Sequence, residues 1–275
     1  MSTLLCIIEN LVGLRVDKEV QRQMKKRGFQ SFEPLTRVIQ KQASLHHRNT
    51  HQTSVAWKAL PLCLPHSICS APETCREVCL LGKWKHRADI IAKAYDKLID
   101  EADTALLLTV VRESWGQELG NLNRLKPETL QRWLQRRLEH LPYLRGIAHV
   151  DVSLNRRLDG FEHWQGHIHA VLTGGTPEEI KAALKIRPTS AVPKPVLLKP
   201  IREGDLARTL AYVTKPLPEG RVAYVAATGR QRQRYVNVPN GHLREHDEWR
   251  MSMLMPARLM IIGMRLGRNG TSECR

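Results

Sequence analysis

Two histidines near the middle of the chain, His167 and His169, have the spacing of paired metal ligands. They flank Ile168 in the stretch Trp164-Gln-Gly-His-Ile-His-Ala-Val-Leu172, whose apolar end is typical of a strand. Residues two apart in a strand point to the same side of the sheet, so both imidazoles project side by side, as a metal ion requires. The alternative is a strand with polar residues facing water, because twelve histidines in 275 residues make a His-x-His tripeptide common by chance.

A second strand, Gly146–Asn155, precedes the histidine pair and offers a carboxylate. Its period-two alternation places on one face His149, Asp151 and Ser153, and on the other Val150, Val152 and Leu154. Joined to Gly166–Thr173 by the loop Arg156–Gln165, it suits an antiparallel pair with Asp151 beside the histidines. Two imidazoles and one carboxylate leave coordination positions open. We therefore expect Asp151 and the two histidines to bind Mg²⁺ or Mn²⁺, which would polarise a phosphoryl oxygen as a Lewis acid.

A tyrosine on a basic helix, Tyr212, follows the histidine pair by about 45 residues. In the predicted helix Gly204–Val213 an apolar stripe is formed by Leu206, Leu210 and Val213, and a second stripe, nearly opposite, by Arg208, Tyr212 and Lys215. The two cations would favour the phenolate and attract a phosphate. We therefore expect Tyr212 to be a nucleophile, with Lys215 binding the phosphate or tuning the tyrosine. The alternative is a surface tyrosine on a basic helix.

Together these residues indicate one chemistry, the transfer of a phosphodiester to a tyrosine. A metal withdraws charge from the phosphate and the tyrosine attacks phosphorus, which gives a covalent phosphotyrosine and a free hydroxyl end. The energy of the phosphodiester is retained, so the ends can be rejoined.

The charge balance favours a nucleic-acid partner for this chemistry. The net charge is +16 and the sequence pI is near 9.9, and a surplus of this size favours a polyanion. The arginine-rich helix Lys126–Leu141 and the loop Arg230–Arg234 are candidate DNA contacts through phosphates. The alternative for each is a solvated basic surface.

A cysteine cluster precedes these elements and is a candidate structural zinc site. Four thiols lie within 17 residues, with His66 between them, and these are Cys63, Cys69, Cys75 and Cys79. Their spacing is not the paired Cys-x-x-Cys of a zinc ribbon, although four thiolates suit one tetrahedral Zn²⁺. The alternative is a loop with unligated thiols.

The elements that position these residues predict an α+β fold. A buried strand over Thr104–Arg112 and the two strands already described suggest a central antiparallel sheet, with helices packed mainly on one face. Helices are predicted over Leu4–Lys26, Lys83–Ile99, Lys126–Leu141, Thr176–Leu184 and Gly204–Val213, and a loop over Arg187–Lys199. No stretch suits a membrane span or a signal peptide, so a cytoplasmic protein is expected.

The order of these motifs resembles the HUH endonucleases and, more narrowly, the rolling-circle plasmid replication initiators. The matching positions are, in chain order, Leu107-Leu-Thr-Val110, Asp151, Trp164, His167-Ile-His169, Tyr212 and Lys215. The resemblance covers roughly residues 60–220 and includes a cysteine cluster before the first helix. Two positions depart from the pattern: Gly166 replaces a frequent proline, and Arg208 stands where some relatives carry a second tyrosine. The chain therefore resembles a single-tyrosine enzyme, which leaves the end of a replication round to an activated water or a second subunit.

The resemblance implies the HUH fold and the nicking of one DNA strand at a plasmid origin, presented as single-stranded or supercoiled DNA. The products would be a 5′-phosphotyrosine at Tyr212 and a 3′-hydroxyl primer for host helicase and polymerase. A rolling-circle-type transposase with the same chemistry is an alternative, and a non-enzymatic, zinc-dependent DNA-binding regulator is another. Four regions are expected: a helical appendage over 1–60, the cysteine cluster over 61–82, the catalytic domain over 83–222 and a basic segment over 223–275.

Overall fold

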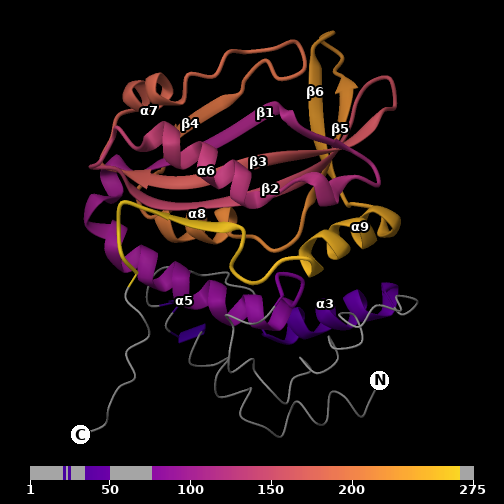
Figure 1. Cartoon of the computed structure of the whole chain (residues 1–275), viewed down its shortest axis with the longest axis horizontal. Helices are drawn as coiled ribbons and strands as arrows, with labels where there is room; N and C mark the ends of the chain where they lie inside the picture. The colour runs from indigo at the N-terminus through magenta and orange to yellow at the C-terminus, as the bar shows by residue number, and fades with distance from the viewer. Residues whose placement is uncertain (1–20, 23, 26–34, 50–75, 267–275) are drawn as a thin grey trace, which may run out of the picture.

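The computed structural model describes residues 21–22, 24–25, 35–49 and 76–266, which form a mixed α+β fold around one curled sheet (Figure 1). Strands in the described part run in the order β4-β1-β3-β2-β5-β6, and β7 also pairs with β2. The strands are β1 (Leu106–Glu118), β2 (Arg145–Arg156), β3 (Glu162–Thr173), β4 (Val196–Pro200), β5 (Glu219–Val225), β6 (Gln231–Val236) and β7 (Leu259–Ile262). The helices are α3 (Leu35–Arg48), α5 (Leu80–Leu98), α6 (Pro127–Leu138), α7 (Pro177–Leu184), α8 (Leu206–Val213) and α9 (Asn240–Met251), with short 3-10 turns η3 (Ile99–Thr104) and η4 (Leu122–Arg124).

The antiparallel pair predicted from the alternating pattern is confirmed as β2 and β3. In its register Asp151 lies opposite His167, and His149 lies opposite His169. Strand β1 pairs with the other side of β3 and places Thr109 opposite His169. The centre of the sheet is therefore built from strands that are adjacent in space and close in sequence.

Helices cover both faces of the sheet, so the expectation of helices mainly on one face is wrong. Helices α6 and α7 pack on the face formed by Val150, Ile168 and their apolar neighbours. Helices α5 and α8 pack on the opposite face, where Ile147 and Val171 continue the core. The reason is that β2 and β3 are buried on both sides, and each side needs its own cover.

The outer edge of β2 is shared by two strands, and one of them is parallel to it. Strand β7 pairs antiparallel with Gly146–His149, and β5 pairs parallel with Ser153–Arg156. The sheet is therefore mixed, whereas the hairpin pattern predicted a purely antiparallel sheet. A parallel neighbour requires a long crossover, here the chain between β2 and β5, and a local pattern does not reveal it.

Most of the predicted helices are present with small shifts of their ends. Helix α7 begins at a capping box in which the Thr176 side chain and Glu179 cap each other, as the predicted N-cap requires. The predicted loop Arg187–Lys199 is wrong only at its end, where Val196–Lys199 belong to the edge strand β4 that pairs with β1. None of the described helices is both apolar enough and long enough to cross a membrane.

The C-terminal region folds onto the sheet through α9 and β7. The expected boundary between residues 222 and 223 falls inside β5. Trp249 on α9 donates a hydrogen bond from Nε1 to the Leu125 carbonyl (2.8 Å), and the side chains of Arg250 and Arg258 are fully buried. This region contributes to the same core as the strands that carry the histidines.

At the N-terminal side, α3 packs against α5. The side chain of Gln42 accepts a hydrogen bond from the Leu80 amide (2.9 Å) and so helps to cap α5. The predicted helix Leu4–Lys26 lies almost wholly outside the described residues, as do Cys63, Cys69, Cys75 and His66. Cys79 is described and lies buried just before α5.

Candidate metal centre

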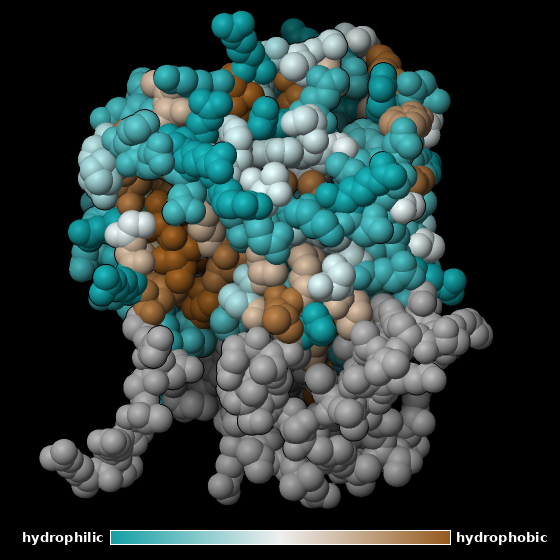
Figure 2. Space-filling model, in the orientation of Figure 1, coloured by the Kyte–Doolittle hydropathy of each residue, from teal (hydrophilic) through white to brown (hydrophobic). Residues whose placement is uncertain are grey.

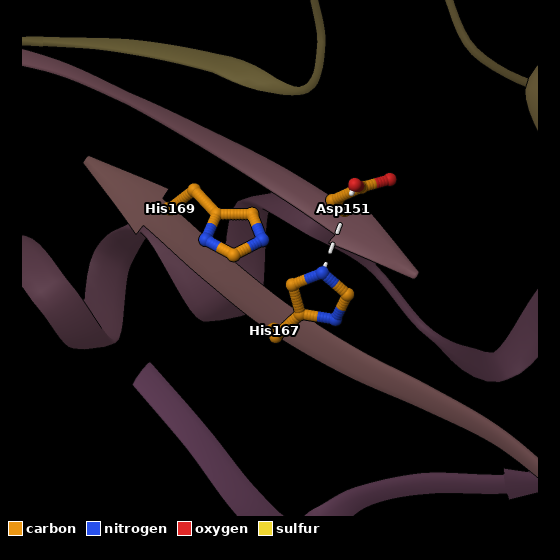
Figure 3. Close-up of side chains that lie close together, drawn as sticks. All are labelled: Asp151, His167 and His169. Atoms are coloured by element: carbon orange, nitrogen blue, oxygen red, sulfur yellow. Dashed lines mark ion pairs between the residues drawn. The ribbon is translucent and has the colours of Figure 1, made fainter. Parts of the chain in front are cut away.

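Asp151, His167 and His169 come together as the register of β2 and β3 dictates. One ligand atom from each lies within 4.8 Å of the others, and all three residues are at most 2% exposed. Figure 3 shows the two imidazoles side by side on β3, with the carboxylate reaching over from β2. Within the described residues this is the group of histidine, cysteine and acidic side chains close enough to bind a metal ion.

The orientation of each imidazole is fixed by a partner behind it. Nδ1 of His167 lies 3.2 Å from the Gln165 carbonyl oxygen, which can only accept, so Nδ1 carries the proton and Nε2 of the neutral ring keeps its lone pair. Nδ1 of His169 lies 2.9 Å from Oγ1 of Thr109 on β1. Both Nε2 atoms are thereby directed to the shared space, which is how partners behind metal-binding histidines act in proteins.

The two oxygens of Asp151 have different roles because the edge of β2 is interrupted at this residue. Oδ1 accepts a hydrogen bond from the amide of Val152 (2.9 Å), which lies between the segments paired with β7 and β5. Oδ2 faces the histidines and lies 3.7 Å from Nε2 of His167. One oxygen therefore satisfies the backbone and the other is oriented towards the shared space.

The three atoms that meet could together hold a metal ion. Oδ2 of Asp151 and Nε2 of both histidines are buried and make no hydrogen bond to any described residue. Buried polar atoms nearly always make a hydrogen bond, so three such atoms without one at a single point are unusual, although Oδ2 also forms an ion pair with Lys215 (3.5 Å). The set combines imidazoles, which transition metals prefer, with a carboxylate, which Mg²⁺ and Mn²⁺ prefer.

The protonation states also suit a metal. Burial raises the pKa of the Asp151 carboxyl, but the adjacent His167 and the charge of Lys215 outweigh it and hold the pKa well below its usual range. Burial, followed by the adjacent His167, holds the pKa of His169 well below its usual range. The carboxylate is therefore ionised and this imidazole neutral near pH 7, as ligands must be.

Tyr212 is placed against the centre by α8, whose apolar stripe is buried as predicted. Its ring centroid lies 5.3 Å from that of His169. The expectation that cations favour the phenolate is not met: burial raises the pKa of Tyr212 and outweighs the opposite effect of Lys215. Arg208, the other expected cation, is exposed, because a helix turns it away from the sheet.

Lys215 bridges the tyrosine and the carboxylate. Its Nζ lies 3.5 Å from Oδ2 of Asp151, 2.6 Å from Oε1 of Glu219 and 4.8 Å from the centroid of the Tyr212 ring. Burial lowers the pKa of Lys215, but Asp151 and Glu219 outweigh it and the pKa is raised. The ammonium is therefore charged and lies between Tyr212 and Asp151.

Sequence reasoning missed the residues behind the centre, Thr109, Glu219 and Arg258. Nη1 of Arg258 lies 3.9 Å from Oδ1 of Asp151, and its Nε donates to Oε2 of Glu77 (3.1 Å). Glu219 follows Lys215 by four residues and Thr109 belongs to the Leu-Thr strand, so both had a weak local signal. Arg258 had none, because it reaches the centre from a distant part of the chain.

A buried ionic cluster lies next to the centre around Glu77. Its Oε2 accepts a hydrogen bond from Nζ of Lys83 (2.6 Å) as well as the bond from Arg258. Burial raises the pKa of Glu77, but Lys83 and Arg258 outweigh it and keep it well below its usual range. Burial is the largest effect on Lys83 and lowers its pKa to about 7.

The two predicted DNA contacts lie at different places on the surface. Arginines of α6 line two cavities of about 470 and 400 Å³ that share Arg137 and Lys185, on the face away from Asp151. Hydrophilic residues cover much of this side of the molecule (Figure 2). The segment Arg230–Arg234 spans the end of the turn between β5 and β6 and the first residues of β6, where the side chains are exposed.

Comparison with protein-family models, with curated proteins and with solved structures found no match to this chain. The described residues include a buried His₂-Asp group that could hold a metal ion, with a tyrosine and a lysine directly beside it.

Proposed function

We propose that this protein is a metal-dependent tyrosine DNA endonuclease and strand transferase that starts rolling-circle replication of a plasmid. The observation that carries the proposal is the position of Tyr212 against His169, with Lys215 between the tyrosine and Asp151. A buried metal site with one adjacent hydroxyl nucleophile suits phosphoryl transfer to that hydroxyl. The net charge of +16 agrees with DNA as the substrate.

The metal would be held by Oδ2 of Asp151 and Nε2 of His167 and His169, and Mg²⁺ or Mn²⁺ is proposed. When bound, the ion supplies Lewis-acid polarisation of a non-bridging phosphate oxygen. Thr109 and the Gln165 carbonyl hold the imidazoles in the ligand orientation, and the Val152 amide holds the carboxylate.

In the proposed step the Tyr212 oxygen attacks phosphorus, a P–O bond to tyrosine forms, and the bond from phosphorus to the 3′ oxygen breaks. Tyr212 loses its phenolic proton and the leaving oxygen gains one, so the step has no net proton change. Because burial raises the pKa of Tyr212, the tyrosine enters neutral and must lose its proton as it attacks. The Lys215 ammonium, 4.8 Å from the ring, stabilises the charge that develops on the phenolic oxygen. The cytoplasmic host polymerase and helicase would then use the 3′-hydroxyl end.

Covalent capture tests this proposal with DNA of random sequence, so that no particular origin has to be chosen. The protein is incubated with a random single-stranded DNA library and Mn²⁺, and adducts that survive denaturation are isolated and sequenced. We expect a metal-dependent adduct that is lost in Tyr212→Phe and His167→Ala, and retained in Tyr143→Phe, an exposed tyrosine elsewhere. The absence of any adduct with the unaltered protein, or an undiminished adduct in Tyr212→Phe, would overturn the proposal.

A further inference from the structure

The β5–β6 hairpin presents an exposed aromatic and basic surface beside the metal centre. Five of the six residues of β6 are exposed, and Tyr235 is 70% exposed, which is unusual for a tyrosine in a strand. Between Gly220 and Val236 the sequence has four arginines and no acidic residue; the arginines are Arg221, Arg230, Arg232 and Arg234. A surface of this composition suits a polyanion that also offers flat apolar groups.

Tyr235 is supported from within the hairpin by Arg221. The two residues are directly paired across β5 and β6, so their side chains share one face of the ribbon. The guanidinium carbon of Arg221 lies 5.7 Å from the centroid of the tyrosine ring. Arg221 thus steadies the ring, and with 70% of the side chain exposed there is room for a planar group to stack on it.

A chain of ion pairs joins this platform to the metal ligands. Arg221 Nη2 lies 3.6 Å from Oε2 of Glu219, whose Oε1 lies 2.6 Å from Nζ of Lys215. Lys215 in turn lies 3.5 Å from Oδ2 of Asp151. The exposed ring is therefore at the surface end of a continuous polar path that begins at the candidate metal centre.

We propose that Tyr235 is a stacking platform for one unpaired base of the DNA strand whose phosphate enters the metal centre. This inference rests on the proposed function. The ring binds a base face next to Arg221, while Arg232 and Arg234 project from the other face of the ribbon and contribute, with Arg230, the positive charge that attracts the strand. Bases within a duplex already stack on one another, so the ring discriminates single-stranded from duplex DNA, whereas the arginines bind both.

Binding measurements without metal test the platform separately from cleavage. Fluorescence anisotropy in EDTA at fixed salt measures the affinity for a labelled oligothymidylate and for a duplex of equal length. Stacking on one aromatic ring predicts that Tyr235→Ala weakens single-strand binding by roughly 10- to 100-fold. We expect duplex binding to change less than about twofold, and Tyr235→Phe and the distant control Tyr143→Ala to bind both DNAs as the unaltered protein does.

The outcomes separate this inference from the proposed function. Unchanged single-strand affinity in Tyr235→Ala, or an equal loss for both DNAs, overturns the platform even when the covalent adduct forms. A selective loss of single-strand affinity supports the platform even when no adduct forms, and then only the nuclease assignment fails.

Discussion

The two faces of strands β2 and β3 are equally buried and have opposite chemistry. On the face towards α6 and α7, Val150, Val152, Ile168 and Ala170 join an apolar core, each at most 1% exposed. On the face towards α5 and α8, the alternating positions are His149, Asp151, His167 and His169, each at most 3% exposed. The same backbone therefore carries a face that stabilises the fold and a face that burial alone destabilises.

The difference shows which residues need an explanation beyond folding. Burial of an apolar side chain is favourable, while burial of a polar group costs free energy unless it is partnered. On the polar face, three candidate ligand atoms at one point and both ring nitrogens of His149 make no hydrogen bond to the part of the chain that the structure describes. Substitutions on the two faces should therefore have separable effects on stability and on metal binding.

The largest effect is expected on the apolar face. Leu134 of α6 is fully buried, and Leu134→Ala should lower the free energy of unfolding by about 2–5 kcal/mol, since it removes apolar contacts and leaves a cavity. Urea denaturation measures this change. Mn²⁺ affinity of the folded variant should stay within about twofold of the unaltered protein, and a large loss would show that the two faces are not separable.

The next largest effect is expected on the polar face, where a substitution should change metal binding and leave stability nearly unchanged. His167→Ala should weaken Mn²⁺ binding by about 100-fold or more, because losing a ligand costs more than losing its supporting partner. Isothermal titration calorimetry or electron paramagnetic resonance measures the affinity. In metal-free buffer the variant should unfold at nearly the same urea concentration. Unaltered Mn²⁺ binding would remove His167 from the site.

A smaller effect is expected at Thr109, which contacts the candidate ligand His169 from the side away from the metal site. Thr109→Val keeps the shape of the side chain but removes the hydroxyl 2.9 Å from Nδ1 of His169, and should weaken Mn²⁺ binding about tenfold. Thr109→Ser restores a hydroxyl and should recover most of the affinity. Equal affinity in the valine and serine variants would show that this hydrogen bond does not orient the ring.

The smallest effect is a pH dependence from buried histidines. Burial holds the pKa of His246 well below its usual range, so the unfolded chain binds a proton that the folded chain does not. Stability from this residue is complete above about pH 6.5 and is lost as the pH falls, by about 1 kcal/mol between pH 6.5 and 5.5.

The matched variant is His246→Phe, which keeps an aromatic ring between Trp164 and Trp249. Denaturation at several pH values should show a shallower acid loss in this variant than in the unaltered protein. Identical slopes would assign the acid sensitivity to other groups, such as His149, whose pKa burial also lowers.

The candidate metal ligands could be predicted because their signals are local. Period-two alternation fixes the faces of β2 and β3, and a short connection fixes their pairing, so Asp151 meets the histidines. The residues around them depend on distant contacts. Strand β7 has four residues and pairs with β2 more than a hundred residues away, and Arg258 enters beside it. The raised pKa of Tyr212 likewise depends on burial, which charge spacing along a helix does not reveal.

The divided edge of β2 has a consequence for the order in which the centre is completed during synthesis. Asp151, His167, His169 and Tyr212 leave the ribosome before β7, yet Arg258 and β7 cover the flank of Asp151. A nascent chain that has not yet reached these residues therefore carries Asp151, both histidines and Tyr212 but lacks the residues that pack behind the carboxylate. The buried surroundings of Asp151 are thus completed only once synthesis has passed β7.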